Sequence, residues 1–166
     1  KMKNSISLIG MAGAGKSSVG KELARMLGFR LIDSDALIEM QHGKSLQNIL
    51  DDEGYLKLRE IENTVLKGIR FNETILSTGG SAVYSDEAME HIQQNSKVIF
   101  LDVPFSQILE RVPNFLDRGF AKAPNQSIED AFVERQELYK KFSHSVVSNT
   151  KDLNYCVSKI LELLEV

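Results

Sequence analysis

The segment from Gly10 to Ser17 has the spacing of a phosphate-binding loop: glycine, four residues, glycine, lysine, then serine or threonine. Glycines let such a backbone turn tightly with its N–H groups pointing inward, and the positive end of the following helix adds to this anion site. Lys16 can reach the β- and γ-phosphates of a nucleotide, and the Ser17 hydroxyl can ligate a Mg²⁺ between them. We therefore expect nucleotide phosphates to bind at Gly13, Ala14, Gly15, Lys16, Ser17 and Ser18.

Two carboxylates, Asp33 and Asp35, follow the short apolar segment 29–32. Residues two apart at the end of a strand can direct one carboxylate toward metal-bound water near Ser17 and the other toward a hydroxyl that accepts phosphate. The alternative is a solvated turn in which an aspartate caps the next helix. The phosphate loop earlier in the chain favours the catalytic interpretation.

Four arginines are candidates for binding anions, because a guanidinium pairs with a carboxylate or a phosphate through two parallel hydrogen bonds. Taken singly, each of them would be interpreted as a solvated surface charge. The four are Arg59, Arg111, Arg118 and Arg135.

Five short apolar segments alternate with helical patterns and predict the strands that must position these residues. This alternation is typical of a three-layer α/β/α fold with a parallel sheet, whose ligands bind at the carboxyl ends of the strands. Gly10, Asp33 and Gly79 would all lie at that edge. The longest continuous apolar run predicts the central strand. The five segments are 6–9, 29–32, 74–77, 97–103 (the central candidate) and 145–148.

Two other segments complete a single domain of 166 residues. Residues from about 36 to 71 show helical spacing and predict a helical insert between two strands. Residues from about 113 to 126 have no periodicity and contain two prolines and a glycine, which predicts a lid loop. Beyond that loop, Ser127 begins a capping-box pattern that opens another helix.

The composition limits the partners of the protein. The chain has 20 basic and 23 acidic residues and a net charge of -3, without a block of like charges, which argues against nucleic acid or membrane as the main partner. One cysteine cannot form an internal disulfide, and no N-terminal segment resembles a signal peptide. We expect a cytoplasmic monomer that acts on a small molecule.

These motifs, in this order and spacing, resemble the shikimate kinases along almost the whole chain. The resemblance implies the nucleoside-monophosphate-kinase type of P-loop fold, ATP with Mg²⁺ as cofactors, and transfer of a phosphoryl group to the 3-hydroxyl of shikimate. The enzyme would be a phosphotransferase with an alcohol acceptor. The motifs are 10–17, 33–35 with Ile38 and Glu39, 58–62, 78–80, Arg118, and Arg135 with Leu138 and Tyr139.

The same resemblance implies roles for single residues. Asp33 would hold Mg²⁺ through water together with Ser17, and Asp35 would hydrogen-bond the accepting hydroxyl. Arg118 would close over the phosphates as part of the lid, and Arg111 would stack near adenine. The catalytic set would be Lys16, Asp35 and Arg118. Shikimate would be held by Asp35, Arg59, Gly79, Gly80 and Arg135, the two arginines binding its carboxylate.

Four positions depart from the family pattern, and they concern the acceptor more than the nucleotide. Ser81 replaces a third glycine, Leu58 replaces a common phenylalanine, and Tyr55 replaces a frequent acidic residue. The lid sequence 118–121 is Arg-Gly-Phe-Ala where the family often has Arg-Pro-Leu-Leu. A serine hydroxyl near the ring and thinner apolar walls would retune the acceptor. Gluconate and nucleoside monophosphates therefore stay as alternative acceptors.

Two interpretations outside the kinases are weaker. A GTPase switch would need Asp51 at a strand end, but Asp51 lies between helical patterns, and the segment 149–152 misses the guanine-reading spacing by one residue. A nonenzymatic nucleotide-binding module would follow if the substrate site had decayed. The presence of Asp35, Arg59 and Arg135 argues against that.

Overall fold

Five parallel strands form one sheet in the order β2-β3-β1-β4-β5 in the computed structural model, which describes residues 4–115 and 122–164. The predicted parallel sheet is confirmed, and each strand lies within about a residue of its expected position. The strands are β1 (Ile6–Ile9), β2 (Arg30–Asp33), β3 (Thr74–Ser77), β4 (Lys97–Asp102) and β5 (Ser145–Ser148).

The central strand is β1, so the prediction that residues 97–103 form the centre of the sheet is wrong. The four inner residues of β4 are fully buried because helices cover both of its faces, although the strand is next to an edge. A continuous apolar run indicates that both faces of a strand are covered. It does not indicate the position of that strand in the order of the sheet.

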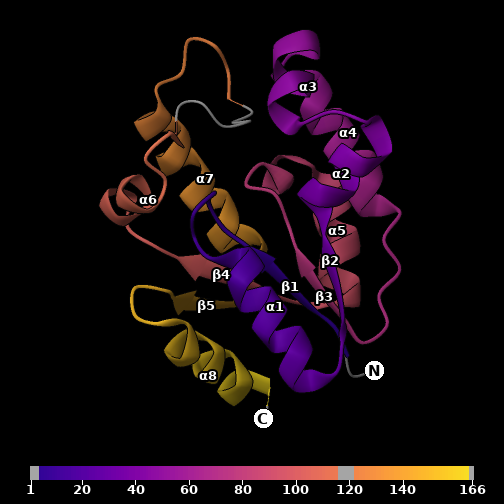
Figure 1. Cartoon of the computed structure of the whole chain (residues 1–166), viewed down its shortest axis with the longest axis vertical. Coiled ribbons are helices and arrows are strands. Elements are labelled where there is room, and N and C mark those ends of the chain that lie inside the picture. The colour runs from indigo at the N-terminus through magenta and orange to yellow at the C-terminus, as the bar shows by residue number, and fades with distance from the viewer. Residues whose placement is uncertain (1–3, 116–121, 165–166) are drawn as a thin grey trace.

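Helices cover the two faces of the sheet (Figure 1). The helices α1 (Lys16–Leu27) and α8 (Leu153–Leu164) pack against each other on one face. The opposite face is covered by α4 (Tyr55–Lys67), α5 (Asp86–Asn95) and α7 (Ile128–Phe142). Right-handed crossovers explain why α1 lies opposite α4, α5 and α7, because the chain moves one way along the sheet from β1 to β2 and the other way from β2 to β5.

Three consecutive helices occupy the segment between β2 and β3. They are α2 (Ser34–His42), α3 (Leu46–Glu53) and α4. Their inner faces form a small apolar cluster of Ile38, Ile49, Leu58 and Ile61, which is separate from the main core around the sheet. The three helices therefore pack around a small apolar core of their own.

Two short elements lie close to the carboxyl ends of the strands. The 3-10 turn η1 (Ala82–Tyr84) follows β3, and α6 (Phe105–Arg111) follows β4. Ser127 accepts a hydrogen bond from Asp130 N at 3.0 Å and caps α7, as its sequence pattern predicts. Among the helices of residues 4–115 and 122–164, none has the length and apolar character that crossing a membrane requires.

Candidate active site

The phosphate loop connects β1 to α1 at the carboxyl edge of the sheet. Gly15 is the N-cap of α1 and has a φ of 96°, a left-handed conformation that favours glycine. The turn is closed by Ala14 N, which donates to Met11 O at 3.0 Å. Strand, loop and helix thus stand in the order that a nucleotide loop requires.

Lys16 lies within this loop. Its side chain is buried, with 7% of the residue exposed, and its Nζ donates to Gly10 O at 2.6 Å and to Met11 O at 2.8 Å. These carbonyl contacts hold the ammonium in the hollow of the loop, where a nucleotide phosphate would meet it.

Arg111 and Asn149 connect the phosphate loop to the loop between β5 and α8. Asn149 Nδ2 donates to Ala14 O at 2.7 Å, and Arg111 donates to Gly13 O at 3.1 Å and to Asn149 O at 2.6 Å. Asn149 N also donates to Asp102 O at 3.0 Å, which fixes it to the end of β4. The sequence analysis missed this role, because it weighed Asn149 only as part of a failed guanine-reading motif.

Asp33 caps α2 and also contacts Ser17, and its role toward metal-bound water stays a prediction. Its Oδ2 accepts a hydrogen bond from Ser17 Oγ at 3.2 Å, and its Oδ1 accepts one from Ala36 N at 3.2 Å and so caps α2. A hydroxyl beside a carboxylate is an oxygen donor set that suits Mg²⁺. Within the described part of the chain, no three His, Cys, Asp or Glu side chains gather into a metal-binding group.

A pocket of about 210 Å³ joins the phosphate loop to the two aspartates. Asp33, Asp35 and Gly80 therefore face the same space as Lys16 and Ser17. The residues that line it are Ala12, Gly13, Gly15, Lys16, Ser17, Ser18, Asp33, Asp35, Ser77, Thr78 and Gly80.

Two carboxylates approach Gly79 from different elements. A Cβ at this position would overlap Asp35 Oδ1 and would stand 2.6 Å from Glu62 Oε2, so the close approach requires glycine. Gly79 N in turn donates to Ser34 Oγ at 3.2 Å. The turn after β3 thus places the Asp35 carboxylate beside a second, buried carboxylate.

Glu62 is that buried carboxylate, and the sequence analysis gave it no role. It is 2% exposed, and burial together with the neighbouring Asp35 charge raises its pKa from 4.5 to about 7. Ser81 Oγ donates to Glu62 Oε1 at 2.5 Å, and this bond and the Arg135 and Lys16 charges oppose the rise. The hydroxyl of Ser81, which we expected near the acceptor ring, is directed to Glu62.

Arg59 and Arg135 meet on the other side of Gly80. Arg135 is 2% exposed, and its Nη1 lies 3.2 Å from the place that a Cβ of Gly80 would take. The Arg59 guanidinium lies over the Tyr84 ring at 3.7 Å and over the Tyr55 ring at 4.9 Å. Burial is the main cause that lowers the pKa of Arg59 from its ordinary value, and the Arg135 charge adds to it. Arg135 thus lies against Gly80, which lines the same pocket as Asp35, and Arg59 lies on a tyrosine ring that Arg135 also contacts.

The predicted residues thus form two adjoining groups, one around the phosphate loop and one around Gly80. Arg111 lies against the outer side of the phosphate loop, at the carbonyl of Gly13. Arg118 and the rest of the segment 116–121, the middle of the predicted lid, lie outside the described residues.

Known proteins share both the sequence and this architecture. A family model described as shikimate kinase matches residues 12–165. A curated shikimate kinase from Sulfurihydrogenibium sp. (strain YO3AOP1) is 34% identical over 161 residues, which cover 96% of each chain. A curated shikimate kinase from Clostridium botulinum (strain Eklund 17B / Type B) is 32% identical over 164 residues, which cover 98% of each chain.

Solved structures agree. A shikimate kinase from Acinetobacter baumannii in complex with shikimate has a TM-score of 0.87 at 30% identity, over 98% of this chain and 93% of that one. A deoxyadenosine kinase from M. mycoides with bound dATP has a TM-score of 0.57 at 17% identity and shares the fold alone. The fold is thus the nucleoside-monophosphate-kinase type of P-loop fold, and with a phosphate loop, paired aspartates and paired arginines at its carboxyl edge the chain belongs to the shikimate kinase family.

Proposed function

We propose that the protein transfers the γ-phosphoryl group of ATP to the 3-hydroxyl of shikimate in a Mg²⁺-dependent reaction. One observation carries this proposal: a single pocket joins Lys16 and Ser17 to Asp35, and Arg135 lies against Gly80 of its lining and shares the Tyr84 ring with Arg59. The phosphate loop would bind the ATP phosphates, the Asp35 carboxylate would bind the accepting hydroxyl, and the two arginines would bind the carboxylate of shikimate.

The nucleotide side supplies charge and position. The backbone N–H groups of the loop and the N-terminus of α1 would bind the phosphates, and Lys16 would move from loop carbonyls to the β- and γ-phosphates. Ser17 and Asp33 would hold Mg²⁺, directly and through water, because their oxygens lie 3.2 Å apart. The ion would neutralise negative charge that develops on the phosphates during transfer. Arg111 would lie near the base, since it contacts the loop that precedes α8.

The acceptor side supplies orientation. Asp35 would accept a hydrogen bond from the 3-hydroxyl and align it for attack on the γ-phosphorus. Gly79 and Gly80 leave room for the ring, and Arg59 and Arg135 would bind its carboxylate through charge-assisted hydrogen bonds. Arg118 would close on the phosphates and exclude water, a role that rests on the family resemblance.

The composition of the chain supports a kinase that acts on a small molecule in the cytoplasm. The one cysteine, Cys156, is buried on α8 and fits a reducing compartment. The acidic balance of the chain supports a small substrate, and we propose that the protein acts on it as a monomer.

A coupled assay that follows ADP formation tests the acceptor. The purified protein receives ATP and Mg²⁺ with shikimate, gluconate or each of several nucleoside monophosphates. We expect turnover with shikimate to exceed turnover with every other acceptor by about 100-fold or more, since a site that hydrogen-bonds both the carboxylate and the hydroxyl of one acceptor rejects molecules that cannot place both groups in the same positions. Turnover with gluconate or a monophosphate at the level of shikimate would contradict the proposal.

A further inference from the structure

The ring of Tyr84 lies between the two arginines of the acceptor site. The Arg59 guanidinium carbon stands 3.7 Å from the ring centroid, and that of Arg135 stands 5.3 Å from it. Both distances are within the range in which a cation is attracted to the negative face of an aromatic ring. One ring therefore contacts both cations.

The ring is held by the elements around it. Tyr84 is the last residue of η1, and the two preceding residues, Ala82 and Val83, are each 1% exposed. The 3-10 turn packs against α4, which carries Arg59, and against α7, which carries Arg135. The Tyr84 hydroxyl donates to the Glu134 carboxylate, also on α7. Tyr84 thus connects the two helices that supply the arginines.

The Tyr84 ring gives two neighbouring cations one shared, uncharged contact. Like charges repel strongly where burial lowers the effective dielectric, and an arginine side chain has several rotamers through which it can turn to solvent. A rigid aromatic face attracts both guanidiniums without neutralising either one. The positive charge stays available for an anion, and the side chains are already oriented before the anion arrives.

We propose that Tyr84 is a positioning residue for the acceptor carboxylate, because its ring holds Arg59 and Arg135 in the geometry that binds one anion. This inference rests on the proposed function. The hydroxyl interacts with Glu134 and with Arg135, whereas the ring is the part of Tyr84 that both cations contact.

The experiment compares Tyr84→Leu with Tyr84→Phe in the coupled assay. Loss of the ring should raise the KM for shikimate about tenfold, while the KM for ATP and kcat stay within about twofold of wild type. Tyr84→Phe keeps the ring and should restore the KM for shikimate to within about threefold of wild type. Tyr84→Met, which has a long side chain without an aromatic face, serves as a second variant and should behave like Tyr84→Leu.

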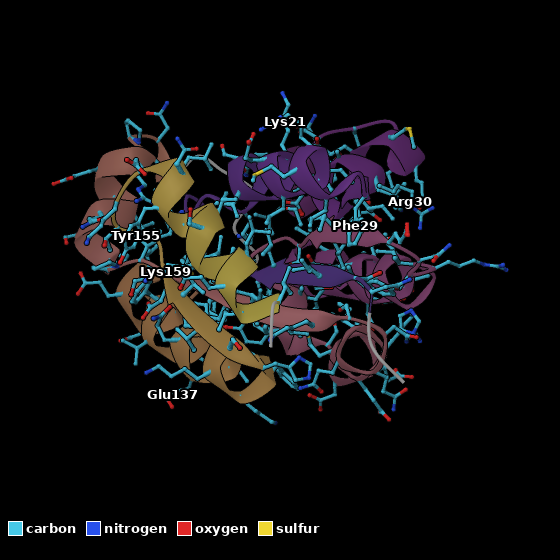
Figure 2. The ribbon with its side chains drawn as sticks, turned by 90° about the horizontal axis from the view of Figure 1, so that it is seen from below. Lys21, Phe29, Arg30, Glu137, Tyr155 and Lys159 are labelled. Atoms are coloured by element: carbon cyan, nitrogen blue, oxygen red, sulfur yellow. The ribbon has the colours of Figure 1, made fainter. Side chains whose placement is uncertain are left out.

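A matched control removes another aromatic ring that contacts cations. Tyr155 on α8 lies 4.4 Å from Lys151 Nζ and 5.4 Å from Lys159 Nζ, measured to its ring centroid. Figure 2 labels Tyr155 and Lys159 on this helix, which covers the face of the sheet opposite to α4 and α7. Tyr155→Leu should leave the KM for shikimate unchanged.

A second measurement isolates the carboxylate. Shikimate methyl ester lacks the anionic charge, so wild type and Tyr84→Leu should bind it within about twofold of each other in equilibrium titrations. An unchanged KM for shikimate in Tyr84→Leu or Tyr84→Met, or an equal loss for acid and ester, would overturn the inference. Failure of the proposed function has a different signature, because the wild-type protein would then be inactive with shikimate.

Discussion

Replacing Glu62 by Gln tests the buried carboxylate beside Asp35. The Glu62 side chain has a pKa of about 7 in the folded protein and 4.5 as an ordinary glutamate, so the folded state binds its proton more tightly than the unfolded chain does. Stability that comes from this proton is fully present below about pH 4.5. This contribution to the free energy of unfolding decreases as the pH rises toward 7, because Glu62 ionises at a lower pH in the unfolded chain than in the folded protein.

The size of the effect follows from the gap between the two pKa values. At about 1.4 kcal/mol per pH unit, the difference between 4.5 and about 7 amounts to about 3 kcal/mol, most of it lost between pH 5 and 8. Glutamine cannot ionise, so the free energy of unfolding of Glu62→Gln should lack this slope. Its amide oxygen can still accept the hydrogen bond from Ser81.

Urea unfolding of the ligand-free protein at several pH values between about 5 and 8, followed by circular dichroism, measures this difference. Wild type should lose about 2 to 3 kcal/mol relative to Glu62→Gln across that range. Glu60→Gln is the matched control, since Glu60 lies on the same helix but is exposed. If the free energies of wild type and Glu62→Gln differed by a constant amount from pH 5 to 8, the reasoning about burial and Asp35 would be refuted.

Four further substitutions test the proposed roles. Lys16→Ala should lower turnover by about 100-fold or more, because its ammonium acts on the transferring phosphate; a variant that kept a tenth of wild-type turnover would contradict this role. Cooperative unfolding should persist, at a cost of about 1 to 3 kcal/mol for the two loop carbonyls that lose their donor. Asp33→Asn should raise the Mg²⁺ concentration needed for half-maximal rate, whereas Asp35→Asn should lower kcat at saturating Mg²⁺, and equal rescue of both by added Mg²⁺ would show that the roles are not divided. Arg118→Ala should lower kcat about 100-fold with little change in shikimate binding, as measured by titration; near-normal turnover would exclude its contact with the phosphates.

The fold and the nucleotide side of the site could be predicted because their signals are local in sequence. The phosphate loop is one contiguous octet, and Asp33 and Asp35 lie directly at a strand end, so the sequence places their backbone at the right edge of the sheet. The order of the strands in the sheet depends on contacts between segments that are distant in the sequence. The apolar run of β4 indicates two covered faces, and only the crossovers decide that β1 lies at the centre.

The residues that sequence analysis missed act through partners distant in the chain. Glu62 lies on an ordinary amphipathic helix, and its raised pKa comes from burial in the folded chain and from the charge of Asp35, which lies beside it at Gly79. Tyr84 would be taken for an aromatic residue of the core, and its function depends on arginines from two other helices. The departures Ser81 and Tyr55 were noticed, but their contacts with Glu62 and Arg59 required the structure.

The separate apolar cluster beneath α2, α3 and α4 has an evolutionary consequence. Arg59 is carried by a layer whose packing depends on Ile38, Ile49, Leu58 and Ile61, while Lys16 is carried by the main core around the sheet. A change of side-chain volume in the small cluster would shift Arg59 relative to the phosphate loop and leave the sheet intact. Selection for a different acceptor could therefore proceed in one part of the gene, while the part that encodes ATP chemistry stays constant.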